Sequence, residues 1–255
     1  MVQIVTDSSV LYTEEEAKAA GFDVIPLCVS VGDMDGRDLQ INMEEFYGRI
    51  GKGEIPRSSQ PPIGDVVEVY EKYQDADVLN ICVADGLSGT YHGALSARDM
   101  VEKAQKMKEE GKGIPEILEW LKSAAEKTES FLIPQDFGFL KRGGRLTPVA
   151  AALGSVLKLK PVMRLTEDGT RLDKFFVKRT MSAAVSGIMD HMKKKGIDGR
   201  YLLYIVHAAA PKEAGAIREM IEAEFKGIQI QMMDLSPVFV AQGGPGCVAI
   251  QYIER

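Results

Sequence analysis

Hydroxyl side chains gather in three short loops, and each loop precedes a predicted helix. The loops are Thr6 to Ser9, Ser58 with Ser59, and Ser88-Gly89-Thr90. The first and the third follow apolar runs that are typical of strands. Hydroxyls and free backbone N–H groups at helix N-termini favour an anion such as a carboxylate or a phosphate. Considered one at a time, each serine is explained equally well as the N-cap of the helix that follows it, without any bound anion.

Ser88 suggests a second kind of chemistry, because a serine between glycines after a strand is typical of a hydrolase nucleophile. It follows the apolar run 78–83 in the stretch Gly86-Leu87-Ser88-Gly89. A nucleophile elbow has the spacing Gly-x-Ser-x-Gly, and here the second glycine comes one residue too early. The spacing argues against a nucleophile and leaves a serine hydrolase as an alternative.

A hydrolase also needs a general base, and the sequence has three histidines. His191 lies among lysines near the end of a predicted helix, where we expect it to be exposed. His92 follows Ser88 by four residues. His207 is better placed, since it directly follows the predicted strand 201–206 and functional groups collect at the carboxyl ends of such strands. A single histidine at the end of a strand more often has a structural role. The position of His207 is therefore the only support for a Ser-His-acid triad.

Phosphate loops and metal sites have less support still. The sequence has no Gly-x-x-x-x-Gly-Lys-Ser/Thr motif, which a phosphate loop requires. The acidic run Asp33, Asp35 and Asp38 has neither the glycine nor the terminal glutamate of a calcium loop, so we interpret it as a solvated turn. We therefore expect no metal, no cofactor and no catalytic residue.

Charge and cysteine content limit the partners and the compartment. The formal net charge is −6 and the pI is about 5.3, which disfavours nucleic acid or an anionic membrane as a partner. The three cysteines are widely separated in apolar runs, as expected of free thiols in a reducing compartment. The start "MVQIVTDSS" lacks the pattern of a signal peptide, and no apolar run approaches the ~20 residues of a membrane span. We expect a cytoplasmic protein without an integral membrane segment.

The order of predicted elements indicates an α/β protein with two domains. Up to about residue 133, strands alternate with helices, which favours a mainly parallel α/β sheet. Beyond Pro148, hairpins mix with helices, which favours an α+β domain. The predicted domains are 1–158 and 159–255, with a shared interface where small-molecule sites are common. Within the first, we predict a hairpin turn at Asp35-Gly36 and a stiff loop over 56–65.

Several motifs together resemble the DegV family over nearly the whole chain. They are "VTDSS", "RSSQPP", "GLSGTYHGALSA", "FLKRGGRL", "LKLKPVM" and "GGPGCVAI", in the family's order and spacing. The resemblance implies a two-domain DegV-like fold. It also implies a fatty-acid-binding protein similar to the binding subunit of bacterial fatty acid kinase.

In that family, the two domains enclose one acyl chain, and hydroxyls hold its carboxylate. A separate fatty acid kinase subunit phosphorylates the carboxylate with ATP, and the acyl phosphate enters phospholipid synthesis. By this resemblance the protein is a carrier rather than an enzyme, and its only bound group is a long-chain fatty acid. The ligand-binding residues implied are Ser58, Ser59, Ser88, Gly89, Thr90, His207 and Gln242. Apolar residues suited to line a tunnel include Phe131, Phe137, Phe139, Leu153, Val156 and Leu157.

The sequence departs from the family pattern in three places. Ser58 stands where the family usually has Thr, and Gln242 stands where many members have His. After Met100 the chain passes directly into a long helix, although family members have a further strand and an Asp-Ser loop there. Either this chain lacks that segment, which would open or rebuild one wall of the pocket, or the printed sequence omits it.

The alternatives to a carrier are a serine hydrolase using Ser88, and a phosphotransfer protein related to dihydroxyacetone kinase that uses His207.

Overall fold

The first part of the chain forms a small parallel sheet. The computed structural model describes residues 2–82, 94–144, 146–151, 159–166 and 171–254, and of residues 94–97 it describes the backbone alone. Strand β1 (Val2–Asp7) lies between β2 (Asp23–Ile25) and β6 (Asp77–Ile81), and both neighbours run parallel to it. Helix α1 (Glu14–Ala20) starts at Thr13, whose side chain accepts from the Glu16 N–H in a capping box. This confirms the mainly parallel sheet expected for the N-terminal part.

Two long helices pack against that sheet. Helix α4 (Ala94–Glu109) contacts β1 and the short 3-10 helix η1 (Ser8–Val10), and α5 (Ile114–Glu126) packs against α4. Buried side chains of these elements form one apolar cluster around Ile4, Phe22 and Val101. Residues 111–113, with glycines at 111 and 113, separate the two helices.

A second small sheet is antiparallel and joins segments that the sequence did not pair. Strand β3 (Cys28–Val31) lies between β4 (Met34–Arg37) and β5 (Arg57–Ser59). The hairpin turn lies at Gly32-Asp33, where Gly32 has φ +61°, so the prediction of a turn at Asp35-Gly36 was wrong. Residues 57–59 form strand β5 rather than the predicted stiff loop, because β3 offers them a ladder of hydrogen bonds. Helices α2 (Met43–Gly51), capped by Asn42, and α3 (Ile63–Lys72) complete this region.

The second part of the chain builds a six-stranded sheet in the order β11-β10-β12-β7-β8-β9. Its strands are β7 (Glu129–Ile133), β8 (Lys160–Leu165), β9 (Leu172–Lys178), β10 (Tyr201–His207), β11 (Gln229–Asp234) and β12 (Val248–Glu254). Strands β10 and β11 are parallel, and the other pairs are antiparallel. The sheet thus includes β7, which precedes residue 158. The domain boundary at that residue stays a prediction.

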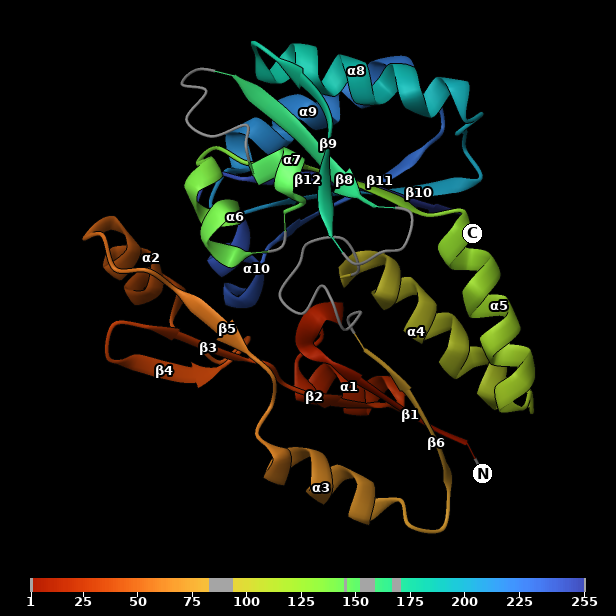
Figure 1. Cartoon of the computed structure of the whole chain (residues 1–255). Coiled ribbons are helices and arrows are strands. Elements are labelled where there is room, and N and C mark those ends of the chain that lie inside the picture. Colours follow the sequence, from red (N-terminus) through yellow and green to blue (C-terminus); the bar gives the residue numbers. More distant parts are fainter. Residues whose placement is uncertain (1, 83–93, 145, 152–158, 167–170, 255) are drawn as a thin grey trace.

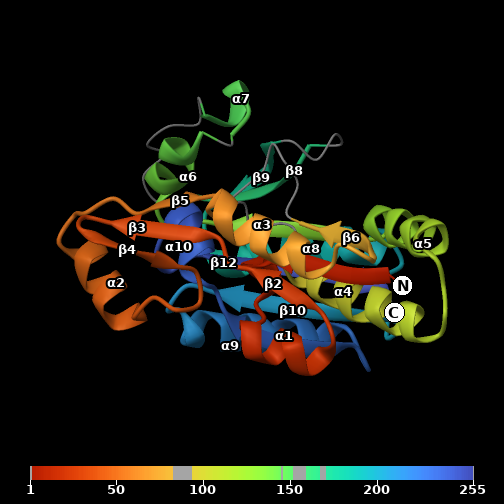
Figure 2. The same cartoon turned by 90° about the horizontal axis from the view of Figure 1, so that it is seen from below.

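Helices cover both faces of the large sheet (Figure 1). Helices α8 (Met181–Lys194) and α9 (Pro211–Glu224) pack on one face. The other face meets α10 (Pro237–Gly243), which is followed outward by α6 (Phe137–Gly143) and α7 (Pro148–Ala151). In both views α10 also lies beside β3 and β5 of the small antiparallel sheet (Figure 2). Helix α10 therefore occupies the junction between the first and second parts of the chain.

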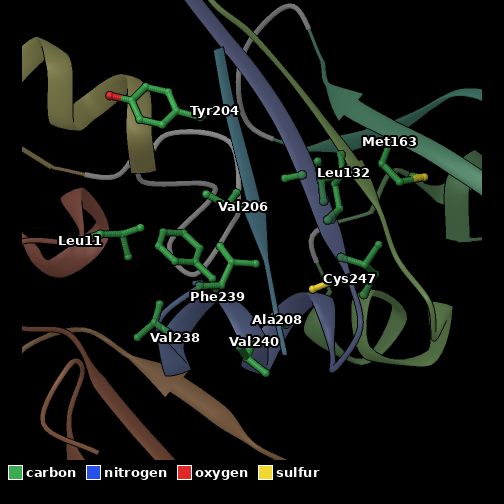
Figure 3. Packing of buried hydrophobic residues seen from close by; sticks show 14 of the residues in the cluster. Leu11, Leu132, Met163, Tyr204, Val206, Ala208, Val238, Phe239, Val240 and Cys247 are labelled. Carbon is green, nitrogen blue, oxygen red and sulfur yellow. The ribbon is translucent and has the colours of Figure 1, made fainter. Parts of the chain in front are cut away.

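The apolar core follows the alternation of β10. Tyr204 and Val206, with Ala208 just after the strand, belong to one apolar cluster with Phe239 of α10 and Phe46, and Figure 3 shows Val206 beside Phe239. Leu203 and Ile205 point to the opposite face and pack with α8 and α9. Within the described residues, no helix combines the length and apolar character needed to cross a membrane.

His191 is held against the large sheet, so the prediction of an exposed side chain was wrong. Its side chain is 17% exposed, and its Nε2 lies 2.6 Å from Glu129 Oε2 on β7. Tyr252 donates to the same carboxylate oxygen, and the His191 ring meets Phe131 and Phe175 edge-on. Burial favours a higher pKa for Glu129, but the bonds from Tyr252 and His191 outweigh it and hold the pKa below its usual value.

Replacing Glu129 with glutamine is expected to reduce the free energy of unfolding at pH 7 by about 1–3 kcal/mol, because Tyr252 and His191 lose a charged acceptor. The lowered pKa means that the stabilisation is present at neutral pH and is lost as the pH falls through the folded-state pKa. Urea denaturation at pH 7 and at acidic pH measures both effects, and the two proteins should converge in acid. The control is Glu126→Gln on the exposed end of α5. An equal loss in both variants at pH 7 would contradict the role given to Glu129.

Candidate functional site

Ser58 and Gln242 come together at the junction between the two parts of the chain. Gln242 Nε2 on α10 donates to Ser58 Oγ on β5 at 3.0 Å, across 184 residues of sequence. Gln242 is 4% exposed, and Ser58 is half-buried. Because the Ser58 oxygen already accepts from Gln242, its own proton is free to point at an anion. Two of the residues implied by the family resemblance thus form one polar pair, while Ser59 beside them is exposed.

Helix α10 positions Gln242, and its local sequence explains its ends. Ser236 stands at the N-cap and Pro237 at the first turn, where the missing N–H of proline costs nothing. The helix stops at Gly244, whose φ is +77°. A Cβ at Gly244 would lie 2.7 Å from Phe139 Cδ2, so glycine here also lets α6 pack closely. Every residue of α10 is buried.

The sequence did not predict α10, although signals for both of its ends are present. Ser236-Pro237 is a typical helix start, and Gly243-Gly244 is a typical stop. The helix has only seven residues and is apolar on nearly every side, so it shows no amphipathic period. Its burial comes from strands and helices on all sides of it, which a local pattern does not reveal.

The hydroxyl loop after β1 lies beside the end of β6. Thr6 pairs with Ile81 in the parallel ladder, and Thr6 Oγ1 donates to the Ile81 carbonyl at 2.6 Å. The chain segments that follow these strands therefore leave the sheet at the same edge. Ser9 Oγ is fully buried and has no hydrogen-bond partner among the described residues. Ser88, Gly89, Thr90 and His92 fall outside the described residues, so their part in the site stays a prediction.

One member of the acidic run 33–38 is buried, which corrects the interpretation of a solvated turn. Asp33 and Asp35 are exposed, as expected, but Asp38 is 1% exposed. Its carboxylate accepts from the Ser8 and Ser236 hydroxyls and from the Val238 N–H. These donors come from two distant segments, so nothing in the spacing of the acidic residues indicated the burial.

His207 lies on a different face of the large sheet from Gln242. Strand alternation puts it with Leu203 and Ile205, on the side that α8 and α9 cover. It is 5% exposed, and its Nδ1 lies 3.1 Å from Asp234 Oδ1 without the angle of a hydrogen bond. A head-group role for His207 stays a prediction.

Lys141, Arg142 and Gly143 of the motif "FLKRGGRL" lie in the last turn of a helix. Helix α6 begins at Asp136, which accepts from the Gly138 N–H, and ends at Gly144 with φ +71°. Lys141 and Arg142 are exposed in its last turn, where positive charge suits the helix dipole. Since α6 packs on α10, these cations belong to the same region as Gln242.

The apolar residues suggested for a tunnel divide between the two faces of the large sheet. Phe137 packs against the cluster around α10, whereas Phe131 is fully buried on the α8 and α9 face. Phe139 is half-buried, and the Arg142 guanidinium lies 4.7 Å from its ring centroid. Leu153, Val156 and Leu157 fall outside the described residues. Among the residues that are described, no group of His, Cys, Asp and Glu is arranged to hold a metal ion.

Solved structures of similar fold cover the whole chain. DegV of Bacillus subtilis, described as a fatty acid binding protein, matches with a TM-score of 0.85 and 24% identity over 100% of this chain and 99% of that one. A DegV family protein from Thermus thermophilus, also described for its fatty acid binding, gives 0.87 and 24% over the same shares. A DegV family protein from Eubacterium eligens, loaded with heptadecanoic acid, gives 0.80 and 19% over the full length of both chains. These likenesses establish the fold.

Sequence comparison points to the same family. Protein DegV of Bacillus subtilis is 29% identical over 279 residues, covering 98% of each chain. A DegV domain-containing protein of Staphylococcus aureus is 27% identical over 289 residues, covering 100% of this chain and 98% of the relative. This alignment is longer than the 255 residues of the chain, so the relative has residues that this chain lacks.

The family model described as "Uncharacterised protein, DegV family" matches in two segments, residues 1–103 and 99–255. The segments overlap at residues 99–103, next to the point where the sequence departs from the family pattern. In the structure this point lies inside α4, which continues without interruption from Ala94 to Glu109. The two matched segments together span the whole sequence. The chain therefore belongs to the DegV family.

Proposed function

We propose that the protein binds a long-chain fatty acid and presents its carboxylate to a separate kinase. The observation that carries the proposal is the polar pair of Ser58 and Gln242, set beside the large apolar cluster around α10. A fatty acid needs this combination of one anion-binding point and an adjoining apolar region. The descriptions of the related structures from Bacillus subtilis and Thermus thermophilus, both named for fatty acid binding, support it.

The two ends of the ligand make different contributions to affinity. Each buried CH₂ group of the acyl chain contributes ~0.8 kcal/mol, so the apolar contacts supply most of the binding free energy. The carboxylate loses water on binding, and charge-assisted hydrogen bonds offset part of that cost. We assign these bonds to the hydroxyls of Ser58 and Ser88 and to the backbone of Gly89 and Thr90. Ser59, His207 and Gln242 complete the proposed set of ligand-binding residues.

The partner kinase supplies the chemistry in this proposal. A carboxylate oxygen of the bound fatty acid attacks the γ-phosphorus of ATP, and ADP leaves with the electron pair of the broken bond. The product is an acyl phosphate for phospholipid synthesis, and the binding protein contributes no nucleophile. We accordingly propose a non-catalytic carrier that works in the cytoplasm with a fatty acid kinase subunit.

Native mass spectrometry of the full-length protein, purified from cells without added lipid, tests the proposal. We expect a bound species whose mass equals a long-chain fatty acid, since an acyl chain buried in an apolar site dissociates slowly. Denaturation in organic solvent followed by lipid analysis should release the same acid.

A different outcome favours the serine hydrolase. If the protein is free of lipid, does not take up oleate, and cleaves a nitrophenyl ester with turnover that Ser88→Ala abolishes, the carrier proposal is wrong. Phosphorylation of His207 by a phosphodonor would favour the phosphotransfer alternative instead.

A further inference from the structure

We infer that Asp38 is a positioning residue, which fixes the N-terminus of α10 and thereby holds Gln242 against Ser58. The contacts that define this role form the Asp38 cluster, which consists of Ser8, Asp38, Ser236 and Val238. In relating Asp38 to ligand binding, the inference rests on the proposed function and extends it to a residue outside the head-group site.

The Asp38 carboxylate joins three segments that are remote in sequence. Its Oδ2 accepts from Ser8 Oγ at 2.8 Å and from Ser236 Oγ at 2.9 Å, and its Oδ1 accepts from the Val238 N–H at 3.1 Å. Ser8 follows β1, while Ser236 and Val238 lie at the start of α10, about 200 residues away from Asp38. A single side chain therefore ties the start of α10 to the N-terminal segment.

The carboxylate takes over the capping of α10. Ser236 stands at the N-cap, where its hydroxyl donates to Asp38 and makes no side-chain bond to the helix. Asp38 itself accepts the Val238 N–H, which is one of the donors that a helix N-terminus leaves unsatisfied. Negative charge at this end also suits the helix dipole. If the carboxylate is removed, the helix loses its cap and its bond to the first part of the chain together.

Backbone interactions on either side of Asp38 fix its position. Its N–H donates to the Leu27 carbonyl at 2.7 Å, and the next residue, Leu39, has φ +65°. A left-handed conformation is unfavourable for leucine and persists where the surroundings impose it. Asp38 is thus a fixed point relative to which α10 is placed.

A shift of the N-terminus of α10 also shifts the Gln242 side chain, because both belong to the same short helix. Val238 and Gln242 are four residues apart, which is about one helical turn or ~6 Å, so both lie on the same side of the helix. Gln242 in turn donates to Ser58 at 3.0 Å. A displacement of roughly 1 Å at Val238 is enough to break that hydrogen bond, since it is lost beyond about 3.5 Å.

Burying the charged form of Asp38 is energetically unfavourable. A simple gain in stability therefore does not account for this carboxylate, whereas a positioning role does. Burial raises the pKa of Asp38 to about 6, and the groups that lower it are hydroxyl and backbone donors rather than cations. Above pH 6 the carboxylate is ionised and accepts from all three donors. Measurements at pH 8 therefore examine the cluster in its ionised form.

A double-mutant cycle for oleate binding at pH 8 tests the inference. We expect Asp38→Ala to weaken oleate binding about tenfold in the wild-type background, but less than twofold in a Gln242→Ala background, because Asp38 acts through Gln242. Asp38→Asn keeps the shape of the side chain, and its amide N–H can donate to the Ser8 and Ser236 hydroxyl oxygens. The oleate affinity of this variant should therefore lie within about threefold of wild type. Equal losses in both backgrounds would overturn the inference.

Hydrogen exchange of the ligand-free protein tests the same inference without any fatty acid. Asp38→Ala should speed amide exchange in residues 238–243 at least tenfold, and Ser236→Ala, which removes one donor, should give a smaller increase. The control is Asp198→Ala, which removes an exposed carboxylate that accepts the Arg200 N–H. Unchanged exchange at α10 would show that Asp38 does not hold the helix. A wild-type protein that binds no oleate would instead overturn the proposed function, and the exchange result would still decide the role of Asp38.

Discussion

Replacing both Ser58 and Ser88 with alanine is expected to weaken binding of a long-chain fatty acid anion by at least about 100-fold, or about 3 kcal/mol or more. Each hydroxyl is assigned one hydrogen bond to a charged carboxylate, and such bonds contribute about 1.5–3 kcal/mol. Ser58→Ala also leaves the buried Gln242 amide without its acceptor, so a loss in stability of about 1 kcal/mol, or about 2–4 °C in Tm, accompanies it. Titration with oleate followed by native mass spectrometry gives the affinity, and thermal denaturation without ligand gives the stability.

Two controls separate head-group binding from general damage. Ser58→Thr keeps the hydroxyl and should bind within about threefold of wild type. The pair Ser123→Ala and Ser182→Ala removes two exposed hydroxyls from α5 and α8 and should leave both affinity and Tm unchanged. Wild-type affinity in the Ser58 and Ser88 double variant would place the head group elsewhere in the molecule.

Local sequence signals predicted those elements whose stability has a local cause. Thr13 and Asn42 cap α1 and α2 through bonds that span three residues, so their chemistry is visible in a short window. The apolar run 201–206 predicts a strand, and β10 confirms it. Strand β5 is different: it has three residues and forms because β3 pairs with it. Elements of this size depend on tertiary contacts that no short window contains.

The candidate site was less predictable than the fold. Ser58 and Gln242 are 184 residues apart, and only the family resemblance placed them together before the structure did. Asp38 looked like a member of a solvated acidic turn, and the hydroxyls that bury it come from near both ends of the chain. His191 looked exposed among lysines, but a carboxylate from β7 holds it at the sheet. In each case the deciding partner is remote in sequence and leaves no trace in local composition.

Helix α4 occupies the place where the sequence departs from the family pattern. Strand β6 is an edge of the first sheet, and α4 packs directly on β1 and η1. The two segments of the family match overlap at residues 99–103, inside α4, which runs from Ala94 to Glu109.

Phe239→Ala is expected to reduce the free energy of unfolding by about 3–5 kcal/mol, which is the range for removing a buried aromatic ring. Phe239 is fully buried, and its cluster includes Val29 and Phe46 beside the small antiparallel sheet as well as Leu132 and Tyr204 of the large one. The cluster that contains this ring therefore includes residues of both the small antiparallel sheet and the large sheet. A loss of this size is a large share of the 5–15 kcal/mol that stabilises a typical domain. Urea denaturation followed by circular dichroism measures it.

The same substitution links the core to the binding site, because Phe239 and Gln242 share α10. Phe239→Leu refills most of the cavity and should cost less than half as much as the alanine variant, while Val149→Ala on the exposed surface of α7 should change stability by less than about 0.5 kcal/mol. Oleate affinity should follow the order wild type, leucine, alanine, since a loosened α10 no longer holds Gln242 near Ser58. If Phe239→Ala destabilises no more than Val149→Ala, the apolar cluster does not secure α10. A stability loss with unchanged oleate affinity would mean that the position of Gln242 is set by its own neighbours rather than by the packing of the helix.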